Sequence, residues 1–272
     1  MKKGIKMVKI AFIGAGNMAS AIVNGIVKSK IIISDNIYLY DKNPTQYTKF
    51  PDGCKSVDNI TKACENADYI FLSVKPQNIK EVLAEIKEIC SNNKVFISIC
   101  AGITINSIEN TLGRVKIVRT MPNTPLLIGH GVTALCRNNE VTDNEFSFVT
   151  SLFASSGFTT ELNEDKINAI TAVTSSSPAY VYYFIKSMLE GAIRLGLEDD
   201  NLLEMICKTF IGSATMVMKD NRSVDELIRM VKSPNGTTEK ALNVFEENEI
   251  LEIICKAMKS CADRADELTK SN

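Results

Sequence analysis

Histidine and tryptophan are the scarcest residue types in this 272-residue chain, which has one histidine, His130, and no tryptophan. Metal sites built from several histidines are therefore excluded, and a Ser-His-Asp triad would have to use this one residue. His130 stands between Gly129 and Gly131, where a solvated turn is expected. We expect no catalytic role for His130 and no bound metal.

The chain also lacks an excess of charge of one sign and any long apolar run. Its 31 lysines and arginines against 32 aspartates and glutamates give a formal net charge of −1, which offers no basic surface to nucleic acid or an anionic membrane. No apolar stretch approaches the roughly 20 residues that span a bilayer. The basic start of the chain leads into Lys9 and a glycine turn, which is not the pattern of a signal peptide. We expect a cytoplasmic protein with no nucleic-acid or membrane partner.

Cysteine is plentiful, but cysteine pairs are absent. No two of the eight cysteines are spaced as C-x-x-C, and a disulfide framework is not expected in a chain of this length without an export signal. Several of these cysteines lie in periodic apolar stretches, where buried thiols pack like small apolar side chains. We expect reduced cysteines in the core.

Residues 8–27, VKIAFIGAGNMASAIVNGIV, contain the most informative pattern near the start of the chain. A short apolar run suited to a buried strand leads into a glycine turn, after which apolar residues recur at helical spacing. In such a turn Gly14 permits the tight bend and Gly16 lets a pyrophosphate approach the backbone. Ala19 is small enough for the helix to pack closely on the strand.

The first N–H groups of that helix, around Asn17 and Met18, favour the negative charge of a diphosphate. We therefore interpret Gly14, Gly16, Asn17 and Met18 as cofactor-binding residues. An ordinary strand-turn-helix is the alternative interpretation.

A second strand is expected over residues 37–40, ending at Asp41. An acidic residue in this place usually hydrogen-bonds the adenosine ribose hydroxyls, which favours NAD. Lys42, next to it, is suited to the 2′-phosphate of NADP instead. The sequence therefore leaves both NADPH and NADH open as the cofactor.

Strand and helix patterns alternate up to about residue 120. Further strands are expected at residues 69–74, 95–99 and 115–118, and helices at residues 57–67, 79–89 and 103–112. This alternation predicts a parallel, doubly wound sheet whose strand ends share one ligand-binding crevice. The loops at Lys75-Pro76, Ala101-Gly102 and Met121–Thr124 would line it. Residues 132–136 and 159–162 are candidates to extend the sheet.

The character of the chain changes beyond about residue 163, where helical periodicity replaces strand patterns. Long helices are expected at residues 181–192, 203–218 and 250–268. The second of these is apolar on nearly every side, which favours a subunit interface, with burial in the domain core as the alternative. We predict an α/β fold with two domains, residues 1–162 for the dinucleotide and residues 163–272 as a helical domain.

Residues 233–239, SPNGTTE, form a second particular stretch. Pro234 presets a turn, Asn235 and Gly236 tolerate positive φ, and Thr237 or Thr238 can cap the helix that follows. The exposed N–H groups and hydroxyls at this helix start are suited to a carboxylate. A plain capped turn is the alternative, as it is for the serine cluster at residues 174–180.

Together these stretches resemble one family, the pyrroline-5-carboxylate reductases. The matching motifs are IGAGNMA (13–19), VKPQ (74–77), AGI (101–103), RTMPNTP (119–125), SSPAY (176–180) and SPNGTT (233–238), in family order along the whole chain. Asn235 stands where the family usually has glycine, and asparagine also tolerates the left-handed region. Arg222-Ser223 replaces the His-Pro of many members, which bears on the local loop and interface only.

The resemblance implies an N-terminal Rossmann-type domain and an all-helical C-terminal domain that joins two subunits, often within larger homo-oligomers such as decamers. It implies that Ser233, Asn235, Gly236 and Thr237 bind the substrate carboxylate.

The resemblance also assigns the groups around the reacting atoms. Thr238 would be the catalytic residue that hydrogen-bonds the ring nitrogen. Ala101, Asn123 and Ser176 would flank the nicotinamide, and Lys75 and Pro76 would also contact the cofactor.

The expected reaction is hydride transfer from NADPH or NADH to the C=N carbon of 1-pyrroline-5-carboxylate, giving L-proline, the last step of proline biosynthesis. Because a protonated imine is already electrophilic, no histidine acid is required. Two alternatives remain: a β-hydroxyacid dehydrogenase-like oxidoreductase, for which no suitably placed lysine is found, and a non-enzymatic dinucleotide-binding dimer.

Overall fold

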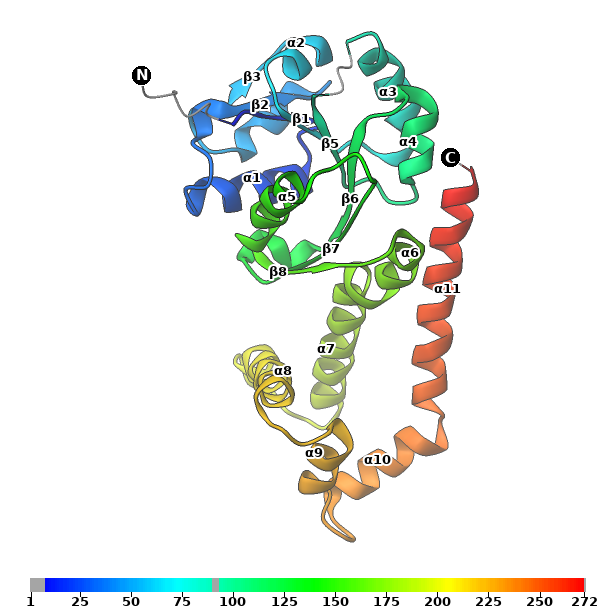
Figure 1. Cartoon of the computed structure of the whole chain (residues 1–272). Helices are drawn as coiled ribbons and strands as arrows, with labels where there is room; N and C mark the ends of the chain where they lie inside the picture. The colour runs from blue at the N-terminus through cyan, green and yellow to red at the C-terminus, as the bar shows by residue number, and fades with distance from the viewer. Residues whose placement is uncertain (1–7, 90–92, 272) are drawn as a thin grey trace. The chain divides into compact units, whose positions relative to one another are not determined.

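The computed structural model describes residues 8–89 and 93–271 (Figure 1). The basic N-terminal segment and one of the eight cysteines, Cys90, lie outside these residues. The chain divides into two compact units. The first unit comprises the chain up to Ser176 together with the segment from Cys261 onward, and the second unit comprises residues Ser177–Ser260.

The first unit is built on one sheet, which has eight strands in the described part of the chain, in the order β3-β2-β1-β4-β5-β6-β7-β8. All neighbouring strands are parallel except β6 and β7, which are antiparallel. The strands are β1 Ile10–Ile13, β2 Ile37–Tyr40, β3 Lys55–Ser56, β4 Tyr69–Leu72, β5 Val95–Ser98, β6 Lys116–Pro122, β7 Gly131–Arg137 and β8 Gly157–Glu161. The predicted Rossmann-type doubly wound sheet is confirmed.

Strand β1 shows why the sheet is buried on both faces. Its four residues are all fully buried, and their side chains alternate between two apolar clusters: Ala11 and Ile13 belong to one, Ile10 and Phe12 to the other. Phe12 stacks on Phe71 of β4 with a ring-centroid distance of 4.2 Å. A strand covered on both sides reads as a continuous apolar run, as this one does.

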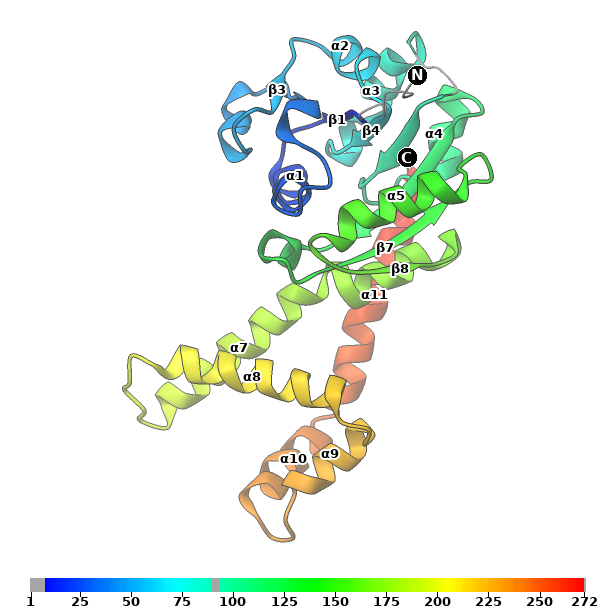
Figure 2. The same ribbon diagram turned by 60° about the vertical axis from the view of Figure 1, so that its left-hand side comes forward.

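Helices cover both faces of the sheet. The cluster with Ala11 takes in α2, α3, α4 and α6, whereas the cluster with Phe12 takes in α1 and α5; α5 lies along β7 and β8 (Figure 2). The helices are α1 Asn17–Lys28, α2 Ile60–Glu65, α3 Ile79–Lys87, α4 Ile105–Leu112, α5 Asp143–Ala154 and α6 Ile167–Ile170, with a π-helical turn at Thr171–Ser175. Short 3₁₀ turns lie at Ser34–Asn36, Pro44–Lys49, Pro76–Asn78, Thr124–Ile128 and Glu164–Lys166.

Strand β6 is longer than the sequence predicts. It continues beyond Val118 to Pro122 because residues 118–122 pair with the antiparallel strand β7. The expectation that this strand ends at residue 118 is therefore wrong, and the chain turns after Asn123 instead, at the 3₁₀ segment Thr124–Ile128. The two candidate extensions of the sheet are confirmed as β7 and β8.

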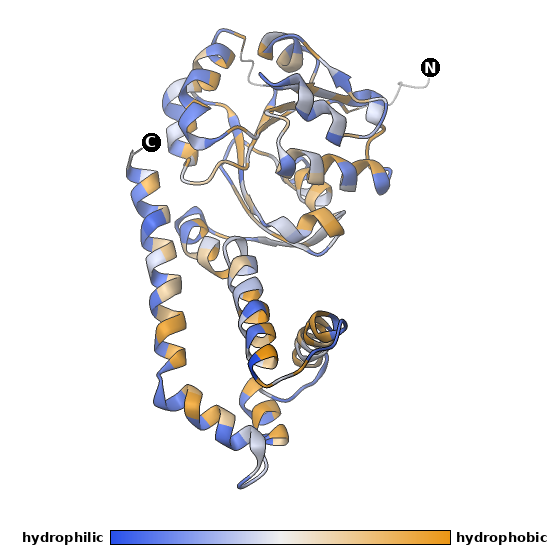
Figure 3. Ribbon diagram, turned by 180° about the vertical axis from the view of Figure 1, so that it is seen from behind, coloured by the Kyte–Doolittle hydropathy of each residue, from blue (hydrophilic) through white to orange (hydrophobic). Residues whose placement is uncertain are grey.

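The second unit is helical throughout its regular structure. It contains α7 Ser177–Arg194, α8 Leu202–Lys219, α9 Val224–Val231, α10 Thr237–Glu247 and the first part of α11 Ile250–Ser271. Apolar residues recur along all of these helices (Figure 3), yet Ile206 is the one residue of this unit, all of which is described, in the buried class. None of the described helices is long and apolar enough to cross a membrane.

The compact units do not divide the chain where the sequence-based domains do. The first unit runs on past residue 162 to Ser176, because Ile167 of α6 is fully buried in the core cluster of the sheet. The division into functional domains at residues 162 and 163 remains a prediction.

The cysteines differ in their surroundings. Cys64, Cys100 and Cys136 are buried, and Cys255 is exposed. Burial raises the pKa of both Cys100 and Cys136 to about 12, so these thiols stay protonated near neutral pH. The expectation of core cysteines holds for these buried positions and is wrong for Cys255.

Candidate functional site

The glycine turn between β1 and α1 has the geometry that its sequence predicts. Gly14 adopts φ +98°, and a Cβ there would lie 2.6 Å from the carbonyl oxygen of Ser73. The Gly14 N–H donates to the carbonyl oxygen of Tyr40 at 2.8 Å, and the Ser73 hydroxyl donates to the Gly14 carbonyl oxygen at 2.6 Å. Residue 14 must therefore be glycine for the turn to pack against β2 and β4.

Gly16 is glycine for a different reason. Its φ of −76° suits any residue, and a Cβ added there would meet no atom of the described part of the chain within 4 Å. The open space lies beside the start of α1, where backbone N–H groups have no intrahelical acceptor. Ala19, one turn later, is 1% exposed, as close packing of helix on strand requires. The turn therefore fits a pyrophosphate, which would occupy the space that a side chain at residue 16 would fill.

Asp41 is placed beside this turn by the parallel pairing of β1 and β2. One carboxylate oxygen accepts from the Ala15 N–H at 2.7 Å, and the other accepts from the Asn43 N–H at 2.8 Å. The carboxylate thus supports the backbone of the turn. Its predicted contact with the cofactor ribose remains a prediction.

Lys42 is exposed and forms an ion pair with Glu81 of α3 at 2.9 Å. The hydrogen bond to Glu81 raises the pKa of Lys42, which keeps this side chain a cation. Both side chains of this ion pair are largely exposed, so the pair contributes little to stability. Replacing Glu81 by another anion as the partner of Lys42 would therefore cost little. The predicted role toward a 2′-phosphate remains a prediction.

The other residues predicted at the dinucleotide are near the same turn or at the ends of neighbouring strands. Asn17 accepts a hydrogen bond from the Lys49 ammonium at 2.8 Å, and Met18 packs partly against the core. Lys75 is exposed and leads into the 3₁₀ turn that starts at Pro76. The Cys100 thiol donates to the carbonyl oxygens of Leu72 and Val74 at 3.3 Å each, so it joins the loop that carries Ala101 to the loop that carries Lys75.

Asn123 stands at the end of β6 and is 7% exposed. Its amide nitrogen donates to the carbonyl oxygen of Thr174 at 2.9 Å, and its amide oxygen accepts from the Val132 N–H at 2.8 Å. The side chain therefore fixes the π-helical turn Thr171–Ser175 against the sheet. Ser176 follows that turn, and its hydroxyl oxygen lies 3.2 Å from the thiol of Cys261 on α11. π-Helical turns such as Thr171–Ser175 recur at functional sites.

In the second unit, the Ser233–Glu239 stretch forms a turn at the start of α10. Asn235 adopts φ +57°, the left-handed conformation for which asparagine is suited. Its N–H donates to the Glu239 carboxylate at 2.8 Å. A Cβ at Gly236 would collide with the Ser233 hydroxyl, so this hydroxyl lies directly over the helix start.

The threonines do not cap this helix. Gly236 is the N-cap and Thr237 is the first helical residue, so the expectation of a threonine cap is wrong. Because no side chain caps α10, the hydroxyls of Thr237 and Thr238 and the first N–H groups of the helix stay available to a ligand. This arrangement suits a carboxylate. The roles of Ser233, Asn235, Gly236, Thr237 and Thr238 remain predictions.

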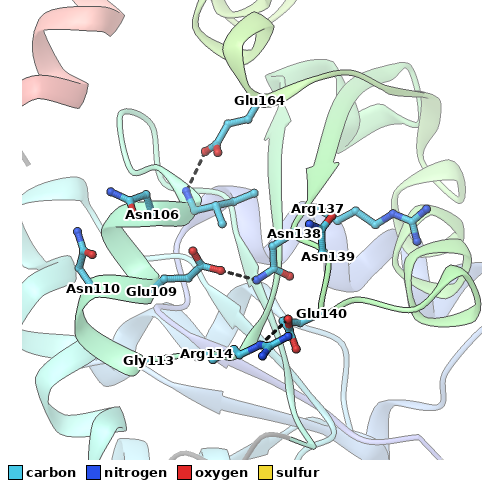
Figure 4. A pocket seen from close by; sticks show the side chains of 11 residues that line it. Asn106, Glu109, Asn110, Gly113, Arg114, Arg137, Asn138, Asn139, Glu140 and Glu164 are labelled. Carbon is cyan, nitrogen blue, oxygen red and sulfur yellow. Dashed lines mark hydrogen bonds and ion pairs between the residues drawn. The ribbon is translucent and has the colours of Figure 1, made fainter.

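An open pocket of about 680 Å³ lies elsewhere in the first unit, beside α4 (Figure 4). Two pairs of its polar side chains bond each other: Arg114 pairs with Glu140 at 2.7 Å, and Asn138 donates to Glu109 at 2.8 Å. None of the predicted site residues lines it. We read it as a solvated depression between surface groups and assign it no ligand.

Comparison with known proteins agrees with the motifs. The family model for pyrroline-5-carboxylate reductase dimerisation matches residues 164–268, and a model for coenzyme F420-dependent NADP oxidoreductases matches residues 9–102. The pyrroline-5-carboxylate reductase of Escherichia coli is 34% identical over 97% of this chain and 99% of its own length. The chain belongs to the pyrroline-5-carboxylate reductase family. An Arabidopsis thaliana relative of the same description is 30% identical over 97% of the chain and 96% of its own length.

Solved structures of the family share the whole fold. The Plasmodium falciparum pyrroline carboxylate reductase with NADP bound superposes with a TM-score of 0.90 at 30% identity, covering 96% of this chain and 98% of that one. The Coxiella burnetii enzyme gives 0.88 at 33% identity, covering 97% and 99%. The Rossmann-type domain followed by a helical dimerisation domain is confirmed, and the protein is an NAD(P)H-dependent oxidoreductase.

Two contributors to the site were not anticipated. Ser73, whose hydroxyl supports Gly14, was signalled only by being the small polar residue after an apolar strand. Arg119 belongs to the RTMPNTP motif, but its partners lie 45 and 49 residues further along the chain. No local pattern in the sequence connects them.

Proposed function

We propose that this protein reduces 1-pyrroline-5-carboxylate to L-proline with NADPH or NADH, the last step of proline biosynthesis. The observation that carries the proposal is the joint presence of two uncapped helix starts in a chain of this family. One is the start of α1, beside the open space at Gly16, and the other is the start of α10, beneath the Ser233 hydroxyl. The first suits a diphosphate, and the second suits a carboxylate.

At the cofactor, Gly14 and Gly16 would leave room for the pyrophosphate, with the N–H groups around Asn17 and Met18 facing it. Asp41 and Lys42 would stand at the adenosine ribose, Lys75 and Pro76 on the neighbouring loop, and Ala101, Asn123 and Ser176 at the nicotinamide. The bound cofactor supplies a hydride. The Plasmodium falciparum relative is described with NADP bound, and Lys42 fits a 2′-phosphate, which favours NADPH here.

At the substrate, Ser233, Asn235, Gly236 and Thr237 would hold the carboxylate and so orient the ring. The imine carbon gains the hydride and the ring nitrogen keeps its proton. The Thr238 hydroxyl oxygen would accept a hydrogen bond from that N–H, holding the ring in register for the transfer. No acid stronger than a hydroxyl is needed, because the protonated imine is already electrophilic.

The second unit would act as a homodimer, within larger assemblies such as a decamer. Helix α8 carries Ile211 at 63% exposed and Met218 at 77% exposed, which a second copy of the chain would cover. We place the protein in the cytoplasm, with no nucleic-acid or membrane partner.

The deciding experiment follows oxidation of NADPH and of NADH by the purified protein with 1-pyrroline-5-carboxylate. Turnover with either cofactor supports the proposal, and the ratio of kcat/KM values settles the preferred one. No turnover with both, together with tight nucleotide binding, would favour a non-enzymatic dinucleotide-binding dimer. Turnover of β-hydroxyacids in place of the imine would favour the β-hydroxyacid dehydrogenase alternative.

The role of Thr238 is tested by Thr238→Ala, with Thr238→Ser as the matched control that keeps the hydroxyl. We expect the alanine variant to lower kcat about a hundred-fold while the Kd for NADPH stays unchanged, and the serine variant to retain most activity. Equal kinetics for the wild type and Thr238→Ala would refute this assignment.

A further inference from the structure

Arg119 is the largest fully buried side chain of the first unit, and it is charged. It lies on β6, on the same face as Ile117 and Met121, and its guanidinium donates to Glu164 and to the Asn168 amide oxygen at 3.0 Å each. Its Nε atom is buried and has no hydrogen-bond partner among the described residues. The Glu164 side chain is 33% exposed, so only the arginine end of this ion pair is buried, and the desolvation of the guanidinium offsets much of the attraction. Its presence therefore calls for another explanation.

Asn168, on α6, passes the interaction on to the C-terminal helix. Its amide oxygen is held by Arg119, so its amide nitrogen points to α11, where it donates to Asp266 at 2.8 Å and to the Thr269 hydroxyl at 3.0 Å. Because Arg119 can only donate, it fixes which way the amide faces. Reversing the amide would break the hydrogen bonds to Arg119 and to Asp266, because it would turn a donor toward the guanidinium and an acceptor toward the carboxylate.

The part of α11 held in this way contacts both loops expected at the nicotinamide. A Cβ at Gly102 would lie 3.0 Å from the Cβ of Leu268, so this turn of α11 packs directly on the loop after Ala101. One end of the same segment is Cys261, whose thiol donates to the Ser176 hydroxyl at 3.2 Å. The residues from Cys261 onward belong to the same compact unit as these loops.

We propose that Arg119, acting through Asn168, is a positioning residue that holds residues 261–271 of α11 against the loops of Ala101 and Ser176. This inference rests on the proposed function, which gives those loops the nicotinamide. The segment packs against these two loops, so its position determines how accurately the loops orient the nicotinamide. Neither Arg119 nor Asn168 is assigned a contact with the substrate.

Asn168→Ala is the central test, because it cuts the connection and leaves the Arg119–Glu164 pair intact. We expect kcat to fall about ten- to a hundred-fold, since small misplacements of reacting groups have effects of that size, while the Kd for NADPH changes less than about two-fold. Asn110→Ala, at an exposed position of α4, is the matched control and should leave both constants unchanged.

The double variant Asp266→Ala/Thr269→Val cuts the same connection from α11, at positions that are not in the buried core. It should reproduce the fall in kcat, and adding Asn168→Ala should cause no further loss, because coupled residues are not additive. Thr269→Ser, which keeps the hydroxyl, should retain activity when made alone. Additive losses would overturn the proposal.

Amide hydrogen exchange tests the connection without turnover. NADP⁺ should slow exchange in residues 261–271 of the wild type, and this protection should be lost in Asn168→Ala while α5 exchanges as before. If the wild type fails to reduce 1-pyrroline-5-carboxylate, the proposed function fails, but exchange still decides whether the segment is held. Unchanged exchange in Asn168→Ala, or faster exchange with unchanged kcat, would overturn the positioning role.

Discussion

The two compact units use apolar residues in opposite ways. In the first unit both faces of the sheet are covered, and residues such as Ile10, Phe12 and Ile97 are fully buried. In the second unit, α7 and α8 pack against each other, yet large apolar side chains such as Tyr183 and Ile211 stay more than 60% exposed. The first unit completes its core within one chain, whereas the second has the surface of a structure that needs a second copy.

The largest effect expected from this difference is on association. Ile211→Glu places a charge on the exposed apolar face of α8 and should weaken the dimer by about 2 kcal/mol or more, roughly thirty-fold in Kd. Light scattering after gel filtration measures the change. Ile33→Glu, at a residue of the first unit that is 52% exposed, is the control and should leave the oligomer intact. If Ile33→Glu dissociated the oligomer and Ile211→Glu did not, the first unit and not the second would form the interface.

Substitutions in the glycine turn test whether the first unit depends on its own contacts. Gly14→Ala forces a Cβ against Ser73 at φ +98° and should lower the free energy of unfolding by about 1–3 kcal/mol as well as abolish nucleotide binding. Gly16→Ala meets no protein atom within 4 Å, so Tm should stay unchanged while the Kd for NADPH rises. Thermal unfolding and nucleotide titration separate the two variants. A large loss of Tm in Gly16→Ala would contradict the open space described here.

The smallest predicted effect is a loss of stability of the first unit at alkaline pH. Burial raises the pKa of Cys100 to about 12, so the folded thiol keeps its proton above pH 9 while the unfolded thiol loses it. Stability from this group is complete below the unfolded pKa and is lost as pH rises toward 12, by about 1 kcal/mol at pH 10.

Urea unfolding at pH 7.5 and pH 10 measures this loss. Cys100→Ala, which removes the titrating thiol, should show a smaller difference between the two pH values than the wild type. An equal difference would assign the alkaline loss to other groups.

Much of the fold can be read from periodicity, and the failures have identifiable causes. The pattern of residues 203–218, apolar on nearly every side, favours a subunit interface over burial in the core, and α8 exposes most of its large apolar side chains, with Ile206 the buried exception. The predicted strand at residues 115–118 ends too early because the last residues of β6 depend on antiparallel pairing with β7, which no local pattern reveals. The same holds for the cap of α10, where backbone geometry selects Gly236 over the threonines.

The residues of the candidate site also differ in whether their contacts are local in the sequence or distant. Gly14 and Gly16 could be assigned from spacing because the turn they make is local. Asp41 could be located, but its hydrogen bond to the Ala15 N–H could not be predicted, since that bond depends on how two strands align. The partners of Arg119 could not be predicted, because they come from the 3₁₀ turn Glu164–Lys166 and from α6, far along the chain from β6.

The return of the chain from Cys261 onward to the first unit has a consequence for the order of events during synthesis. The partners of Asn168 on α11 lie 98 and 101 residues further along the chain. While the ribosome is still adding the helices of the second unit, the sheet is already made, but Asn168 and the loop of Gly102 lack their covering helix. The nucleotide-binding unit therefore starts to fold first and is completed last, when the final turns of α11 have emerged.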